Sequence, residues 1–153
     1  MIELVIPKLE DLWFREKLLA DEETMSYNHA WGGTISFPEE KWQNWYDRWI
    51  INHENKRYYR YLKDDKGFVG EIACHYDSEY DGYVADVIIF SQFRGRGYGA
   101  QGLELLCRAA KENGIQVLYD DIAIDNTAIH LFIQKGFYEV SRTAERIILK
   151  KDL

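Results

Sequence analysis

The stretch that decides the fold is FRGRGYGAQGLELL, residues 93–106. Two arginines and three glycines crowd into residues 94–99, directly after the apolar run YVADVIIF at 83–90. Apolar residues then recur at i, i+3, i+4 and i+7, which predicts a helix with one buried stripe; they are Leu103, Leu106, Cys107 and Ala110. The stretch therefore predicts a buried strand that turns through glycines into an amphipathic helix.

Such a turn is suited to binding an anion. A helix N-terminus carries unpaired N–H groups and a partial charge of about +0.5, and glycine lets a phosphate approach the backbone closely. Arg94 and Arg96 add positive charge. We therefore predict that backbone amides along residues 94–100 bind a pyrophosphate. The structural alternative is a tight turn whose arginines are simply solvated.

One possible ligand is a dinucleotide of the NAD type. Residues 97–102 match the G-x-G-x-x-G fingerprint, and Asp120 and Asp121 follow about 20 residues later, where a ribose-binding acid is expected. Two observations oppose this interpretation. Residues 91–94 separate the preceding strand from the fingerprint, and only about 50 residues follow Gly102, too few for the rest of a doubly wound sheet.

The rest of the chain predicts a mixed α/β (α+β) fold in one domain, residues 1–153. We expect strands at 2–6, 56–63, 68–76, 83–90, 115–124, 137–142 and 145–150. Helices are expected from Pro7 to residue 20, from Ser36 or Phe37 to residue 52, across 98–113, and from 126 to 135 with Asp125 as the cap. Residues 21–35 have no clear period and predict a loop or a broken helix.

Composition excludes several classes of protein. The net charge of −7 disfavours nucleic-acid binding. No apolar run reaches the roughly 18 residues that span a bilayer, and the N-terminal residues lack the pattern of a signal peptide. Cys74 and Cys107 lie in apolar patterns, and no spacing suggests a metal site. We expect a cytoplasmic protein without a metal or a membrane partner.

Two motifs together resemble the GCN5-related N-acetyltransferases (GNAT). Residues 94–99, RGRGYG, are similar to the family's R/Q-x-x-G-x-G/A motif. Residues 125–137, DNTAIHLFIQKGF, are similar to its D-N-x-x-A…L-Y-x-K-x-G-F segment. The resemblance covers about residues 2–150. It implies a mostly antiparallel sheet with a splayed central strand pair and an N-acetyltransferase domain over 1–153. It also implies transfer of an acetyl group from acetyl-CoA to a primary amine, either of a small molecule such as a polyamine or of a peptide N-terminus. Proteins of this family are often homodimers.

The resemblance also implies roles for individual residues. The pyrophosphate of coenzyme A would contact amides of Arg94, Gly95, Arg96, Gly97, Tyr98, Gly99 and Ala100. The strand ending at Ile89 and Phe90 would pair with the pantetheine arm, which Asn126 would contact from the other side. An Asp-Asn pair is also a good helix start, so Asn126 has a structural alternative.

Phe132 is a departure from the family's pattern, which often has a tyrosine that protonates the departing thiolate. Phe132, expected in the cofactor site, cannot donate a proton. Either another donor serves, Tyr138 or Tyr98, or the reaction proceeds without one. A third reading is a CoA-binding module that does not catalyse.

The acceptor side has weaker signals. Asp86 is a candidate base because a carboxylate on a buried strand is expensive unless it is used; His75 and Tyr83 are alternatives. Trp31, in an irregular loop, and Tyr83 are candidates for contacting the amine. For each of these residues an ordinary hydrogen-bonded structural role is the alternative. The aromatic stripe Trp42, Trp45, Tyr46 and Trp49 predicts core packing.

Overall fold

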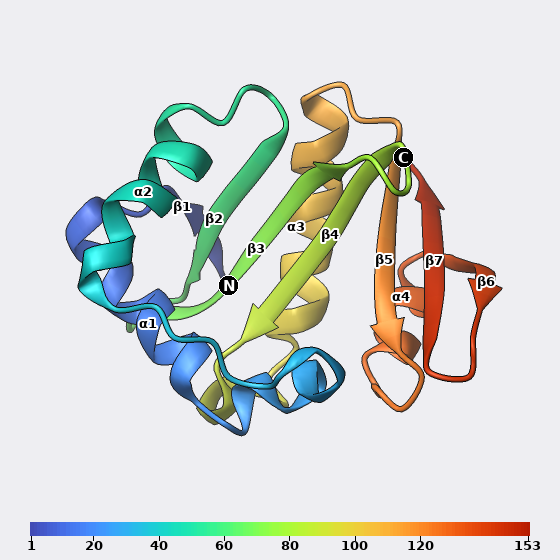
Figure 1. Cartoon of the computed structure of the whole chain (residues 1–153), viewed down its shortest axis with the longest axis horizontal. Coiled ribbons are helices and arrows are strands. Elements are labelled where there is room, and N and C mark those ends of the chain that lie inside the picture. Colours follow the sequence, from blue (N-terminus) through green and yellow to red (C-terminus); the bar gives the residue numbers. More distant parts are fainter.

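The computed structural model describes residues 1–153 as a seven-stranded sheet with helices on both faces (Figure 1). The strand order is β1-β2-β3-β4-β5-β7-β6. The strands are β1 (Glu3–Val5), β2 (Arg57–Lys63), β3 (Phe68–Asp77), β4 (Gly82–Ile89), β5 (Val117–Ala123), β6 (Tyr138–Arg142) and β7 (Arg146–Asp152). All neighbours pair antiparallel except β4 and β5, which are parallel. The predicted mixed, mostly antiparallel sheet is confirmed.

The first third of the chain is helical but broken into short pieces. They are η1 (Leu9–Asp11), α1 (Leu12–Ala20), η2 (Thr24–Trp31), η3 (Glu39–Lys41), α2 (Trp42–Tyr46) and η4 (Asp47–Ile51). The second helical region begins later than predicted, because Pro38 is extended (φ −69°, ψ 163°) and occupies the cap position before Glu39. It is also not one continuous α-helix, because η4 is a π-helical turn. Residues 21–35 do form a broken helical segment.

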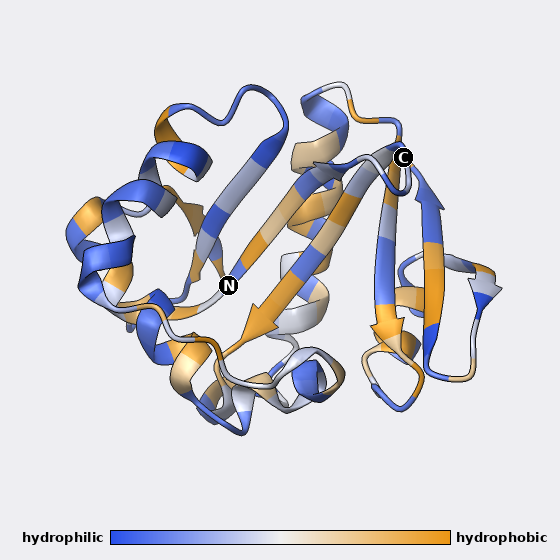
Figure 2. Cartoon of the chain, viewed as in Figure 1, coloured by the Kyte–Doolittle hydropathy of each residue, from blue (hydrophilic) through white to orange (hydrophobic).

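Two hydrophobic cores lie on opposite faces of the sheet. Residues of α3 (Tyr98–Glu112) and α4 (Ile129–Gln134) pack with inward side chains such as Ile72, Ala85 and Leu118. Residues of α1 and η2 pack on the other face with Tyr59, Tyr61, Ala73, Ile88 and Phe90. Side chains alternate along a strand, so β2, β3 and β4 supply both cores. Hydrophobic residues make up much of β4 (Figure 2). Cys74 and Cys107 are buried free thiols in the first core, as predicted.

Close packing of α3 on the sheet depends on Gly102. A Cβ at this position would lie 2.9 Å from Leu62 Cδ1, closer than real contacts allow, and 3.4 Å from Ile72 Cγ2. The third glycine of the fingerprint-like run therefore serves helix–sheet packing. Because Gly102 packs against the sheet in the first core, the start of α3 lies beside the end of β4.

The centre of the sheet is split. β4 and β5 are registered only at Tyr83↔Leu118 and Val84↔Tyr119, and beyond that point they diverge (Figure 1). The predicted splayed strand pair is thus present. The gap opens toward the carboxyl ends of both strands, where α3 and α4 begin.

The segment after β5 differs from its prediction. α4 begins at Ile129 with Ala128 at its cap, and no side chain caps it. Asp125, the predicted cap, instead accepts a hydrogen bond from His29, with 3.1 Å between Nε2 and Oδ1. No helix of the structure is both long and apolar enough to cross a membrane.

Candidate active site

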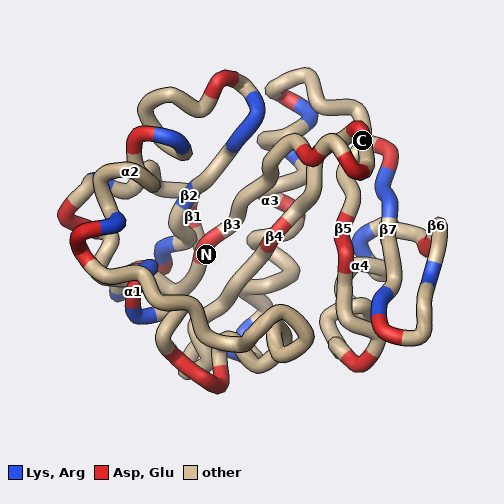
Figure 3. The backbone as a smooth tube through the Cα atoms, in the orientation of Figure 1, with Lys and Arg blue, Asp and Glu red and all other residues tan.

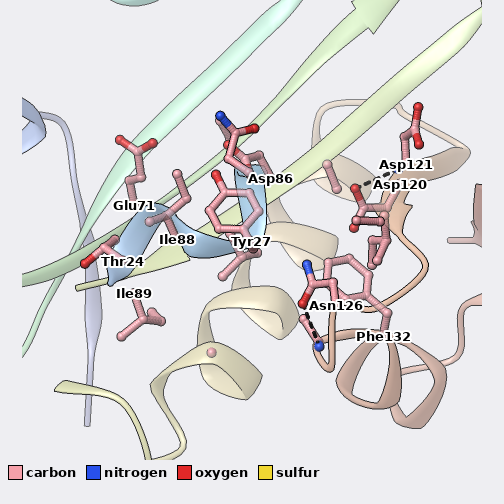
Figure 4. Close-up of a pocket in the computed structure, with 18 of the residues that line it drawn as sticks. Thr24, Tyr27, Glu71, Asp86, Ile88, Ile89, Asp120, Asp121, Asn126 and Phe132 are labelled. Carbon is pink, nitrogen blue, oxygen red and sulfur yellow. Dashed lines mark hydrogen bonds between the residues drawn. The ribbon is translucent and has the colours of Figure 1, made fainter. Parts of the chain in front are cut away.

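A cavity of about 1070 Å³ occupies the gap between β4 and β5 (Figure 4). Its walls come from α1, η2, β3, β4, the turn before α3, β5 and the loop before α4. One end reaches the glycine turn, and the other lies among the aromatic and acidic side chains of η2, β3 and the β3–β4 hairpin. An elongated ligand with an anionic end can therefore pass through the split sheet.

The glycine turn forms a cradle of free backbone donors. The amides of residues 95–100 donate to no acceptor within the protein. Gly95 (φ 78°) and Gly97 (φ 80°) adopt the left-handed conformation, which residues with a Cβ rarely accept. Gly95, Gly97, Tyr98 and Gly99 line the cavity. Successive free amides at the start of a 15-residue helix make an anion site.

The two arginines of the turn have different partners and positions. Arg94 lines the cavity, and its Nη2 donates to the Thr24 carbonyl at 2.9 Å, so it ties the turn to η2. Arg96 does not line the cavity; its guanidinium lies 5.5 Å from the centre of the Phe93 ring. Ala100 does not line the cavity either, so only its amide belongs to the cradle. The Tyr98 hydroxyl donates to Asp64 at 2.9 Å.

The predicted pantetheine contacts are only partly in the cavity. Ile89, Asn126 and Phe132 line it, whereas Phe90 is buried on the other face against Phe14. Asn126 Oδ1 accepts a hydrogen bond from the Ala128 amide at 2.9 Å, the helix-start role considered as its alternative. Its Nδ2 donates to no acceptor in the protein. Phe132 packs edge-to-face on Phe137 at 5.0 Å.

Asp86 lies on β4 in the cavity, half-buried and without a cationic partner. Burial, followed by the negative charge of Glu71, raises the pKa of Asp86 from 3.8 to about 7, while Arg15 acts in the opposite direction. Tyr27 of η2 lines the same region, and the burial of its phenol and the charge of Asp86 raise its pKa. A carboxylate whose pKa is near neutral pH can take up a proton there.

A buried ion pair forms the wall beside Asp86. Arg15 Nη1 donates to both carboxylate oxygens of Glu71, at 2.9 and 2.8 Å, and the Tyr59 hydroxyl donates to the same carboxylate. The Arg15 guanidinium also lies 4.6 Å from the centre of the Trp45 ring. Arg15 and Glu71 thus neutralise each other, and Trp45 and Trp49 serve both the second core and the cavity wall.

Two carboxylates of β5 face the same cavity. Asp121 is neutralised: it accepts hydrogen bonds from the Tyr80 hydroxyl at 2.7 Å and from Arg146 at 2.8 Å. Asp120 has no cationic partner, and its Oδ1 accepts only the Asp121 amide at 2.9 Å. Burial and then the charge of Asp86 raise the pKa of Asp120 well above its usual value. Acidic positions are visible on β3, β4 and β5 around the gap (Figure 3).

Two predicted residues lie outside the cavity. Tyr83 donates through its hydroxyl to the Asn55 carbonyl at 2.8 Å, and Tyr138 lies exposed on β6, where it donates to Asp152 at 3.2 Å. Neither lines the cavity, so their positions do not support roles in amine binding or proton transfer. Trp31 does line it, with 48% of its surface exposed. His75 also lines it, and burial lowers its pKa.

Four residues of the cavity had no predicted place in this site: Arg15, Tyr27, Glu71 and Asp120. Glu71 had a signal of the same kind as Asp86, a carboxylate inside the apolar strand FVGEIACHY. Arg15 and Tyr27 had none, because their places depend on how α1 and η2 pack across the sheet. Asp120 was considered only as a ribose ligand.

Comparison with known proteins finds a matching family and a related protein. The family model described as "Acetyltransferase (GNAT) family" matches residues 15–137. An 80-residue segment is 32% identical to the uncharacterized N-acetyltransferase YycN of Bacillus subtilis (strain 168), and the match spans 50% of this chain and 51% of that protein.

Two solved structures share the fold. The spermidine N-acetyltransferase of Vibrio cholerae, in complex with CoA and spermine, superposes with a TM-score of 0.77 at 19% identity, covering 97% of this chain and 94% of that one. The ribosomal-protein-alanine N-acetyltransferase of Brucella melitensis has a TM-score of 0.77 at 20% identity, with 100% and 99% covered.

Proposed function

The chain belongs to the GNAT family of acetyltransferases, and on that premise we propose that it transfers an acetyl group from acetyl-CoA to a primary amine. The acceptor is a cationic small molecule of the polyamine type or, as the second candidate, a peptide N-terminus. The observation that carries this proposal is the cavity through the split sheet, with free amides at one end and an unpaired carboxylate, Asp86, in its wall.

The residues present fit coenzyme A. The free amides of residues 95–100 would bind its diphosphate, where a side chain at Gly95 or Gly97 would strain the backbone. Ile89 and the free Nδ2 of Asn126 would border the pantetheine arm, and Phe132 would give it an apolar contact. When bound, acetyl-CoA supplies an acyl thioester at the gap. The dinucleotide alternative is disfavoured, because the sheet is mostly antiparallel, with only β4 and β5 parallel, whereas a doubly wound dinucleotide-binding sheet is mostly parallel.

Asp86 would remove the proton from the amine. An amine with a pKa of about 10.4 is protonated at neutral pH, and freeing its lone pair at pH 7 costs about 4.6 kcal/mol. The pKa of Asp86, about 7, suits a base that accepts this proton near neutral pH. An α-amine with a pKa of about 7.8 needs less help, at about 1 kcal/mol.

The charge of the cavity favours a cationic acceptor. Seven carboxylates line it: Glu71, Asp77, Glu79, Asp86, Asp120, Asp121 and Asp125. Three arginines line it, and each is already engaged: Arg15 by Glu71, Arg94 by the Thr24 carbonyl and Arg146 by Asp121. Trp31 and Tyr27 add aromatic faces on which an ammonium group can lie.

The proposal is tested by binding and turnover together. Calorimetry should show micromolar binding of CoA and far weaker binding of NAD; the reverse order would support the dinucleotide alternative. Release of free thiol should then be measured across spermidine, spermine, lysine and short peptides. Firm CoA binding without thiol release from any amine would overturn the enzymatic proposal and indicate a binding module. Release only with peptides would replace the polyamine acceptor by the N-terminus.

A further inference from the structure

Asp120 is the cavity carboxylate with no assigned role. It lies on β5, across the gap from Asp86, and both line the cavity (Figure 4). Neither has a cationic partner. Such a group is expensive to keep in a cleft unless it is used, and two carboxylates in one cleft resist ionising together.

The two carboxylates enter the gap from opposite faces of the sheet. Asp86 is two residues before Ile88, which packs in the core of α1 and η2. Asp120 lies between Leu118 and Ile122, both in the core of α3 and α4. Since side chains alternate along a strand, Asp86 belongs to the acceptor side and Asp120 to the side of α3, α4 and Phe132. The amide cradle also lies on that second side, so the cofactor's arm would reach the gap past Asp120.

We propose that Asp120, in its protonated form, is the catalytic acid that protonates the departing sulfur, while Asp86 is the base. This inference rests on the proposed function. Asp120 Oδ1 is held by the Asp121 amide at 2.9 Å, and Oδ2 has no partner in the protein, which leaves it free to present a proton to the cavity. Phe132, the aromatic side chain on the same side, has no proton to give.

The proton balance is complete. The amine nitrogen forms a bond to the acetyl carbon, the C–S bond breaks and its electron pair goes to sulfur. Asp86 takes the proton that the ammonium group must lose before attack and releases it to water. As the C–S bond breaks, the nitrogen loses a second proton to Asp86, and Asp120 gives its own proton to the sulfur. The products are an amide and a free thiol, and transfer of the proton from Asp86 to Asp120, directly or through water, restores both groups.

The surroundings of the two carboxyl groups give them different pKa values, as a catalytic acid and a catalytic base require. Burial and the charge of Asp86 raise the pKa of Asp120 well above its usual value, which favours the protonated form, whereas burial raises the pKa of Asp86 to about 7. The other titratable or charged groups around them are Arg15 of α1, Tyr27 and His29 of η2, Tyr59 of β2, Glu71, His75 and Asp77 of β3, Glu79 and Tyr80 of the hairpin, Asp121 of β5, Asp125 of the next loop and Arg146 of β7.

The test compares pH profiles of kcat/KM for the wild type, Asp120→Asn and Asp121→Asn. The wild type should give a bell-shaped profile, in which activity rises on the acidic limb as Asp86 loses its proton and falls on the alkaline limb as Asp120 loses its own. Asp120→Asn should lower kcat roughly 100-fold or more, abolish the alkaline limb and leave CoA affinity within about twofold. Asp121→Asn is the matched control: the neighbouring charge it removes helps to raise the pKa of Asp120, so the alkaline limb should persist but move to lower pH.

The outcomes separate the possible failures. An unchanged bell in Asp120→Asn, or lost activity with the alkaline limb intact, overturns the role of Asp120. If Asp120→Asn does not fold, as a melting curve would show, the decision falls to Asp121→Asn, where an unmoved alkaline limb contradicts the inference. A wild type that binds CoA but acetylates no amine would refute the proposed function itself.

Discussion

Replacing Asp86 by asparagine should make the protein more stable at neutral pH while abolishing acetyl transfer. The wild-type carboxyl has a pKa of about 7 in the folded chain, against 3.8 without the fold. Below pH 3.8 this carboxyl is protonated in both the folded and the unfolded state, so it does not change the free energy of unfolding. As the pH rises to 7, the unfolded chain releases this proton and the folded chain retains it, so stability falls.

The magnitude follows from that difference of about three pH units. At 1.36 kcal/mol per unit, the carboxyl of Asp86 destabilises the fold by about 4 kcal/mol above pH 7 and by about half as much near pH 5.5. Asparagine has no proton to lose. The free energy of unfolding of Asp86→Asn, relative to wild type, should therefore rise by about 4 kcal/mol between pH 4 and pH 8.

Urea unfolding at pH 4, 5.5 and 8 measures this difference directly. Glu139→Gln is a suitable control, because Glu139 pairs with Arg142 on the exposed edge strand β6, where solvent screens the pair, and the substitution should change stability little at any of the three pH values. A constant offset between Asp86→Asn and wild type across the three pH values would refute the argument that burial raises the pKa of Asp86. It would also remove the main reason for naming Asp86 the base.

Three further predictions follow from single positions. Gly97→Ala should lose about 1–2 kcal/mol of stability in a denaturant titration, because φ is 80° and the added methyl meets no atom closer than 3.9 Å, so backbone strain is the main cost. Gly114→Ala, with φ 83° at the far end of α3, is the control and should lose as much stability. Calorimetry should show weakened CoA binding only for Gly97→Ala. Arg15→Ala should lose about 3–5 kcal/mol in urea unfolding because it strands the buried Glu71 carboxylate, and a loss below 1 kcal/mol would mean that the pair is solvated. Both cysteines should react with DTNB only after denaturation, since burial raises the pKa of Cys74 to about 12 and also raises that of Cys107; rapid labelling of the native protein would contradict this.

Local patterns predicted the glycine turn and the elements that flank it. The glycine turn, the buried strand before it and the stripe of α3 are all encoded within residues 83–110, so periodicity and glycine placement suffice. In the structure Gly95 and Gly97 have positive φ, and Gly102 packs closely on the sheet. The backbone contact of Phe90 with the pantetheine arm stays a prediction, while its side chain lies in the core of α1 and η2, because neighbouring residues of a strand face opposite sides.

The part of the site that would bind the acceptor could not be predicted from local sequence, because it depends on long-range packing. Tyr83 and Tyr138 carry polar tips that suited a site, yet each finds a partner elsewhere, in the Asn55 carbonyl and in Asp152. Arg15 reaches the cavity only because α1 lies across β3, where Glu71 is 56 residues away in sequence. Asp120 gains its significance from a split between strands that pair at only two positions. None of these relations has a local signature.

The central claim is that the free amides of residues 95–100 hold the diphosphate of coenzyme A. The most direct measurement is a titration of the ¹⁵N-labelled protein with CoA, followed through the backbone amide resonances. The account predicts that the resonances of residues 95–100 shift the most and saturate with CoA, and that NAD at the same concentration leaves them nearly unmoved. Saturable CoA binding that leaves these six amides in place would contradict it.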